Sequence, residues 1–344
     1  MKFKRAFLIL LPVLFTAQAC NFFSLTSEEG SGTRGIFRSS DSGAAWEAAS
    51  RGAAAKQSFA GAQVSRLFVE EQEPVNLLAA TLGSGLLGSD NRGDTWVVLL
   101  PRVAVYDAFI SRSNHDEIFA AGNRDRVAAI YKSVDRGKTW TQVYSEAASA
   151  TSVTALESPG NDGKVLYAGL SSGALLQSQD GGSTWQGVAD FKDRIVDIVA
   201  PAQNPQKVFA LTRSTGLHRS SDGGATWTNL KVTGSAETFF TIATEPRNPE
   251  TIYTGTAGGL FRSSDGGATW TRLPLPATPS ENSVTAAAIN PQDSRQIFAA
   301  IRWTLYRSDD GGESWRTAAL PTRRVMGSIV IDPQEPNRIY AGFK

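Results

Sequence analysis

The sequence contains a single cysteine, Cys20, among 344 residues. It follows a basic N-terminus, an apolar run (6–15) and a stretch of small residues, which together are typical of a secretory leader and its cleavage site. No cysteine occurs after this junction, so disulfides cannot stabilise the fold even in an oxidising compartment. The hydrophobic core must therefore be large enough to do so alone.

Long apolar runs are also missing from the N-terminus. The run 6–15 is shorter than the roughly 20 residues that a helix needs to cross a bilayer, which disfavours an uncleaved anchor. We therefore expect a leader over residues 1–20. Residues 21–34, rich in Ser, Glu and Gly without periodicity, are expected to form a flexible tether, and residues 35–344 the folded part.

Histidine and net charge are low as well. His115 and His218 are far apart and neither has a neighbour at ligand spacing, so we expect no metal site and no cofactor. The formal charge of +1 becomes −2 once Lys2, Lys4 and Arg5 leave with the leader, because 31 basic residues then face 33 acidic ones. This balance argues against nucleic-acid binding and against a polybasic membrane contact.

What the sequence does contain is one motif, Ser-x-Asp-x-Gly-x-Thr-Trp, in seven copies. Successive motif tryptophans are 50, 44, 45, 42, 43 and 45 residues apart, a period that fits a four-stranded propeller blade and is too long for one hairpin. The acidic positions are Asp41, Asn91, Asp135, Asp180, Asp222, Asp265 and Asp310, and the tryptophans are Trp46, Trp96, Trp140, Trp185, Trp227, Trp270 and Trp315.

The two chain ends indicate how the blades close. Each unit reads as two strands, a short loop, a third strand, the motif turn and a fourth strand, but the first motif has only its own two strands and the last unit stops after two. We expect residues 35–49 to pair with residues 327–343, which completes an all-β, seven-bladed propeller of four-stranded antiparallel blades. Closure would leave no open blade edge at the seam.

The motif residues have a structural explanation. The Asp carboxylate can accept backbone N–H groups of its own turn, the Gly supplies a positive φ, and the Trp is expected to point inward as an apolar wedge. A calcium loop would need more oxygen ligands than Ser-x-Asp-x-Gly offers.

The seven copies resemble the Asp-box, or bacterial neuraminidase, repeats of sialidases, xyloglucan-degrading endoglucanases, the sortilin ectodomain and photosystem II assembly-factor propellers. The resemblance extends from about residue 35 to the end of the chain. In those families the box implies a blade and no particular chemistry, so it predicts a fold and leaves the function open.

Cys20 resembles the lipidated cysteine of bacterial lipoproteins. The resemblance implies a lipid anchor on Cys20 and a place in the bacterial cell envelope, and Asn21 favours the outer membrane or cell surface over the inner membrane. The alternative is an ordinary leader with an incidental cysteine.

Propellers usually bind ligands on the face that carries the loops into each inner strand and the turns between second and third strands. We call this the loop face, and the opposite face, with the Asp boxes, the box face. The longest second-to-third connection is expected at 123–126, and Trp303 is the one tryptophan outside a box. The ligand candidates are Arg66, Asp107, Arg124, Asp125, Arg126, Arg213, Arg302, Trp303, Arg323 and Arg324.

Two functions fit these residues. The first is a monomeric, non-catalytic module that holds a protein partner on the arginine-bearing face. The second is glycan binding or hydrolysis, for which two carboxyl groups must flank a bond. The carboxyl candidates are Asp107, Asp125, Asp193, Asp197, Glu237 and Glu281. Sialidases have six blades and an Arg-Ile-Pro motif, which this chain lacks, and the xyloglucan-degrading enzymes pair two propellers, so the first function is favoured.

Overall fold

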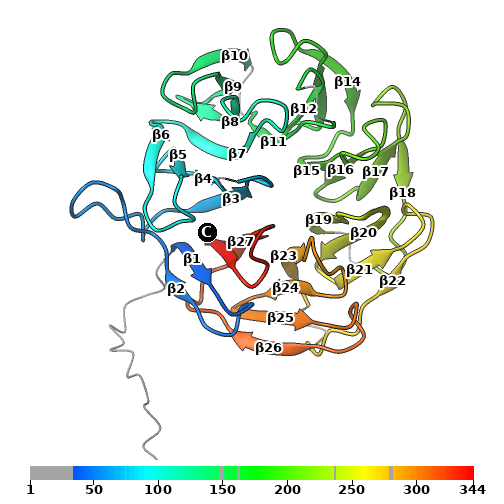
Figure 1. Cartoon of the computed structure of the whole chain (residues 1–344). Helices are drawn as coiled ribbons and strands as arrows, with labels where there is room; N and C mark the ends of the chain where they lie inside the picture. The colour runs from blue at the N-terminus through cyan, green and yellow to red at the C-terminus, as the bar shows by residue number, and fades with distance from the viewer. Residues whose placement is uncertain (1–33, 74, 147–150, 161–162, 236–237, 279–281) are drawn as a thin grey trace, which may run out of the picture. The chain divides into compact units, whose positions relative to one another are not determined.

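A computed structural model of the chain describes residues 34–344 except 74, 147–150, 161–162, 236–237 and 279–281. These residues form 28 strands, arranged as seven four-stranded antiparallel sheets. Figure 1 shows the sheets as blades around a ring. The described residues contain no helix long and apolar enough to cross a membrane.

Blades are numbered in the order of their inner strands, and each is given from its inner to its outer strand. Blade 1 comprises β3 (Val64–Val69), β4 (Leu77–Thr81), β5 (Leu86–Ser89) and β6 (Val97–Leu100). Blade 2 comprises β7 (Ala104–Ile110), β8 (Ile118–Arg124), β9 (Val127–Ser133) and β10 (Thr141–Glu146). Blade 3 comprises β11 (Val153–Glu157), β12 (Leu166–Leu170), β13 (Ala174–Ser178) and β14 (Gln186–Asp190).

The next three blades repeat this order. Blade 4 comprises β15 (Ile195–Val199), β16 (Val208–Thr212), β17 (Leu217–Ser220) and β18 (Thr228–Leu230). Blade 5 comprises β19 (Phe239–Glu245), β20 (Asn248–Thr256), β21 (Gly259–Ser263) and β22 (Thr271–Arg272). Blade 6 comprises β23 (Val284–Ile289), β24 (Ile297–Ile301), β25 (Thr304–Ser308) and β26 (Arg316–Ala319).

Blade 7 joins the two ends of the folded region. Its strands are β27 (Met326–Ile331), β28 (Ile339–Phe343), β1 (Gly35–Ser39) and β2 (Glu47–Ala48). β1 pairs with β28 over five residues, from Gly35 opposite Phe343 to Ser39 opposite Ile339. The predicted seven-bladed fold and its closure by the N- and C-terminal strands are confirmed.

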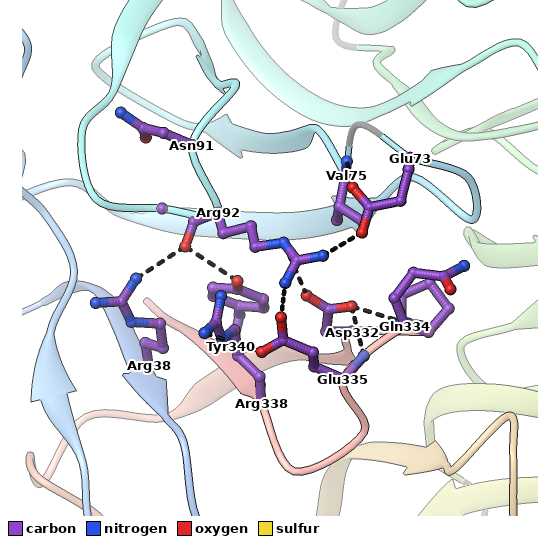
Figure 2. Close-up of polar contacts among 12 residues, drawn as sticks. Arg38, Glu73, Val75, Asn91, Arg92, Asp332, Gln334, Glu335, Arg338 and Tyr340 are labelled. Atoms are coloured by element: carbon purple, nitrogen blue, oxygen red, sulfur yellow. Dashed lines mark hydrogen bonds and ion pairs between the residues drawn. The ribbon is translucent and has the colours of Figure 1, made fainter.

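An ion cluster reinforces the boundary between blades 7 and 1 (Figure 2). Arg92, in the second box turn, points toward the turn between β27 and β28, where its guanidinium pairs with Glu335 and has Nε 3.8 Å from Oδ2 of Asp332. The same guanidinium also pairs with Glu73 of blade 1. Arg38 lies across the same boundary and donates to the Arg92 carbonyl at 3.0 Å. Both arginines therefore tie the closing blade to its neighbour.

Each Asp box is a closed set of hydrogen bonds, as the fourth copy illustrates. The Ser178 hydroxyl donates to Asp180 Oδ1 and accepts from the Gly182 N–H, both at 2.8 Å. Asp180 accepts from the backbone N–H of Thr184 at 2.8 Å and from its hydroxyl at 2.7 Å. Gly182 has φ 88°, which a residue with a Cβ adopts only under strain. The box thus holds its turn with its own side chains.

The prediction that the box tryptophans point inward is confirmed, because each of the seven belongs to a hydrophobic cluster or packs against one. Only Trp96 is fully buried, while the other six are partly buried. The indole of Trp185, for example, donates to the Gly182 carbonyl of its own box at 3.1 Å, while its ring packs against the hydrophobic cluster between blades 2 and 3. Trp96 differs because it donates to the Ala49 carbonyl at 2.7 Å, in the segment between β2 and β3 that covers it.

Candidate functional site

The inner strands β3, β7, β11, β15, β19, β23 and β27 line the centre of the ring. Each contains a register shift near its start, where one extra residue interrupts the pairing with the second strand. The extra residues are Ser65, Tyr106, Thr154, Val196, Phe240, Thr285 and Gly327, and the residues that follow them are Arg66, Asp107, Ala155, Asp197, Thr241, Ala286 and Ser328. Three of the following residues are charged, and they meet in the channel.

Arg66 connects its own blade 1 to two other blades through ion pairs. Its Nη1 lies 2.7 Å from Asp197 Oδ2 in blade 4, and its Nε lies 3.7 Å from Asp107 Oδ1 in blade 2. Both carboxylates also accept backbone N–H groups, Asp197 from Ile198 and Asp107 from Leu156 of blade 3, each at 2.9 Å. Arg66 and Asp107 line two cavities, one of about 280 Å³ toward the box face and one of about 470 Å³ toward the loop face. We call Arg66, Asp107 and Asp197 together the channel waist.

Burial changes the titration of the carboxyl groups at the waist. Desolvation raises the pKa of Asp107 to about 6, against the lowering effect of Arg66 and with a further rise from Asp197. Desolvation also raises the pKa of Glu157, on the box side of the waist, to about 7, although Arg112 opposes the shift. The Arg66 pKa is raised because its two partner carboxylates outweigh its own desolvation. Burial thus opposes the charge of Asp107 and Glu157, while Arg66 favours the charged form of Asp107.

The loop face carries arginines that lie over aromatic rings. Arg124 lies 5.2 Å from the centroid of Tyr131 in blade 2, and Arg213 lies 4.4 Å from that of Phe240 at the channel. Around blades 6 and 7, both Arg302 and Arg323 lie over Trp303, at 5.4 and 6.0 Å. An aromatic neighbour holds each guanidinium in place by a cation–π contact while it stays accessible at the surface.

The predicted candidates thus fall into separate groups. Arg66 and Asp107 meet in the channel, and Arg302, Trp303 and Arg323 form one cluster, to which the next residue, Arg324, is adjacent in sequence. Arg124, Asp125 and Arg126 lie on the separate blade 2, and Arg213 lies at the channel mouth. The structure therefore brings some of the ten candidates together and leaves others apart.

The expected long connection at 123–126 was wrong. β8 continues to Arg124 and β9 begins at Val127, so the connection is the two-residue turn Asp125–Arg126, with φ 52° and 67°. Two positive φ values are the geometry of a tight hairpin turn that follows the twist of its strands.

Three of the six carboxyl candidates are engaged in contacts within the protein. Asp193 accepts the backbone N–H groups of Ser214 and Thr215 at 2.6 and 2.7 Å, which fixes the neighbouring loop. Asp107 and Asp197 belong to the waist. Glu237, Glu281 and Cys20 lie outside the described residues. Within the described part of the chain, no three His, Cys, Asp or Glu side chains are grouped to hold a metal ion.

Several residues of the channel were absent from the candidates. The sequence pattern marked Asp197 only as a carboxyl candidate for hydrolysis, and Arg194, Phe240 and Lys344 were not among the predicted ligand residues. A usable signal was present: Arg66, Asp107 and Asp197 each stand two residues after a buried Val or Ile that is the first or second residue of an inner strand. Lys344 carries no such signal, because its place depends on the closure of the ring.

Two family models match the chain, and they agree with the propeller fold and the Asp boxes described above. The model described as photosynthesis system II assembly factor YCF48 matches residues 188–334, and that of the DUF6242 beta propeller domain matches residues 113–241. The chain is an Asp-box β-propeller. No curated protein matches it.

Solved structures share the fold of this Asp-box propeller at low sequence identity. The GH74 xyloglucanase of Xanthomonas campestris is 19% identical with a TM-score of 0.69, over 82% of this chain and 51% of that enzyme. YCF48 from Cyanidioschyzon merolae is 17% identical with a TM-score of 0.63, over 82% of this chain and 96% of that protein. A YCF48 structure with bound D1 peptide is 15% identical with a TM-score of 0.62, over 82% and 92% of the two chains.

The two groups of similar structures differ in how much of their length is shared. The propeller spans 51% of the Xanthomonas campestris xyloglucanase and 51% of the GH74 enzyme of Niastella koreensis, but more than nine-tenths of the two YCF48 chains. These likenesses establish the fold and leave the ligand open.

Proposed function

We propose that this propeller is a non-catalytic binding or assembly module, held at the outside of a bacterial envelope by a lipid on Cys20, whose loop face binds a protein partner. One observation carries the choice of partner. Trp303 is 44% exposed, and both Arg302 and Arg323 lie over its ring. A sugar would have to displace these guanidiniums to stack on the indole, whereas an acidic peptide would pair with them. The YCF48 structure with bound D1 peptide fits a protein ligand for this kind of propeller.

The second candidate is glycan binding or cleavage, favoured by the similarity to GH74 xyloglucanases. Hydrolysis needs two carboxyl groups on either side of one bond. Asp107 and Asp197 share Arg66, and Asp193 holds a loop, so these three are committed to contacts within the protein. This arrangement favours the protein partner.

Photocrosslinking in living cells tests the loop face. A benzoylphenylalanine at Trp303 should form adducts with a discrete protein, and Arg302→Ala with Arg323→Ala should abolish them. The matched control is the same probe at Val134, which is 61% exposed in a box turn on the opposite face. Equal adducts at both positions, or release of reducing ends from xyloglucan by the purified protein, would contradict the proposal.

The anchor is tested separately. Labelled fatty acid should enter the wild-type protein and not Cys20→Ser, which should be released from the membrane fraction. Incorporation that persists in the variant would contradict lipidation at this residue.

A further inference from the structure

The loop-face end of the channel is a basic cavity of about 470 Å³, the channel mouth. Six of the seven extra residues of the inner strands line it, and Phe240 and Tyr106 are the aromatic ones. Its other lining residues include Arg66, Arg194, Arg213 and Lys344. The channel waist lies at its inner end, because Arg66 and Asp107 line both this cavity and the one toward the box face. The volume of the mouth suits the end of a chain or a single side chain.

The seventh extra residue, Gly327, makes room for one of these cations. A Cβ at Gly327 would lie 2.5 Å from Cε of Lys344, so the missing side chain lets Lys344 lie over this position. The Lys344 backbone N–H donates to the Val325 carbonyl at 3.0 Å, which holds the residue beside β27. Gly327 does not have a positive φ, so its backbone conformation does not require glycine. What glycine provides at this position is the space that Lys344 occupies.

Arg194 and Arg213 are fixed on the adjoining loops. The Arg213 N–H donates to the Arg194 carbonyl at 2.9 Å, and the Arg213 guanidinium donates to the Phe239 carbonyl at 3.3 Å while it lies over Phe240. The two loops are thus bonded to each other and to β19 before any ligand arrives.

These cations lie close enough to disfavour one another's charge. Desolvation and then Arg194, Arg66 and Arg213 lower the pKa of Lys344. Desolvation and then Arg194 lower the pKa of Arg213, with Asp193 opposing. None of Arg194, Arg213 and Lys344 forms a salt bridge with a carboxylate side chain of the described residues, because Asp193 faces the loop N–H groups and Asp107 and Asp197 face Arg66.

We propose that the channel mouth binds the carboxylate at the end of an extended peptide, with Arg194, Arg213 and Lys344 around the carboxylate and Phe240 and Tyr106 beside the preceding apolar side chain. An anion would relieve the mutual repulsion of the three cations, and two guanidiniums offer the planar donors that a carboxylate accepts. The volume suits one or two residues and excludes a folded domain. This inference rests on the proposed function, since it names the group of the partner that enters the channel.

The test uses a fluorescein-labelled hexapeptide, Gly-Ser-Gly-Ser-Gly-Phe, with a free or an amidated C-terminus, and the purified protein without its lipid. Anisotropy should show binding of the free acid and at least about tenfold weaker binding of the amide. Arg194→Ala and Arg213→Ala should each weaken binding of the free-acid peptide at least about tenfold. Gly327→Ala leaves the net charge unchanged but should weaken binding of this peptide several-fold, because the new Cβ displaces Lys344. Arg316→Ala is the matched control, since Arg316 is 84% exposed on the outer strand of blade 6, and it should bind like the wild type.

Three results would overturn the inference. The first is equal affinity for the acid and the amide peptide, and the second is a loss of peptide affinity in Arg316→Ala as large as in Arg194→Ala and Arg213→Ala. The third is binding of succinate or inorganic phosphate without binding of the peptide. Persistence of the Trp303 crosslinks in Arg194→Ala and Arg213→Ala would then show that the proposed function survives without this site.

Discussion

Arg66 of blade 1 donates to Asp197 of blade 4 at 2.7 Å, an ion pair between residues 131 positions apart that joins two non-adjacent blades through the centre of the ring. Asp107 of blade 2 shares the same guanidinium. One arginine thus links three blades and lines the cavities on both faces.

Arg66→Met should destabilise the fold by about 2 kcal/mol, because it leaves two buried carboxyl groups without their cation. The loss is below that of a fully buried pair because the Arg66 side chain is 37% exposed. Urea unfolding at pH 7, followed by tryptophan fluorescence, measures it. A triple variant that adds Asp107→Asn and Asp197→Asn should recover part of the loss. A single variant as stable as the wild type would mean that the waist contributes nothing.

Stability should pass through a maximum near pH 5. The pKa values of Asp107 and Glu157 are raised to about 6 and about 7, so the folded protein binds protons before the unfolded chain does as pH falls from 8 to 5. Stability should therefore rise by roughly 4 kcal/mol over this range. Four box aspartates have pKa values lowered to about 2, namely Asp135, Asp180, Asp222 and Asp265. Their contribution is present above pH 4 and is lost as pH falls toward 2. Chemical denaturation from pH 8 to 3 measures the curve, and a flat profile between pH 8 and 5 would contradict the raised values.

Ser178→Ala should cost about 1 to 2 kcal/mol, because it leaves the buried Gly182 N–H without its acceptor. Asp180→Asn should be milder than Asp180→Ala. Box 2 already uses Asn91, whose Oδ1 accepts the Thr95 N–H at 3.0 Å as the aspartates do in other boxes. Thermal unfolding of the three variants gives the order, and an Asn variant as damaged as the Ala variant would contradict this account.

Arg92→Ala should loosen the boundary between blades 7 and 1. Asp332 is fully buried, and its Oδ2 has no hydrogen-bond partner among the described residues, so Arg92 is the cation that offsets its charge. We expect a loss of about 2 kcal/mol and faster amide exchange at residues 36–38 than in blade 4. Arg136→Ala, which removes an exposed ion pair with Asp116, is the control and should change neither measurement. Uniform exchange across all blades would contradict a local role.

The blade count and its closure were predictable from sequence because seven boxes at a regular period leave few other ways to bury the strands. The channel waist could be predicted only in part from the sequence. Arg66 and Asp107 stand at matching places in neighbouring repeats, but the contact with Asp197 depends on how strands from blades 1 and 4 face each other once the ring exists. Loop lengths were harder to predict: residues 123–126 contain Asn, Asp and two Arg, yet the strands extend into them and leave only Asp125 and Arg126 as the turn.

The pairing of β1 with β28 sets an order of assembly. Gly35 leaves the ribosome roughly 300 residues before its partner Phe343, which at a typical rate of synthesis is on the order of 15 to 60 seconds earlier. Six blades can form as their residues emerge, but the hairpin of β1 and β2 has no strand to join until the end of translation. The final blade to assemble therefore contains the earliest of the described strands to be synthesised, and until then the β1 edge of this hairpin has no partner strand.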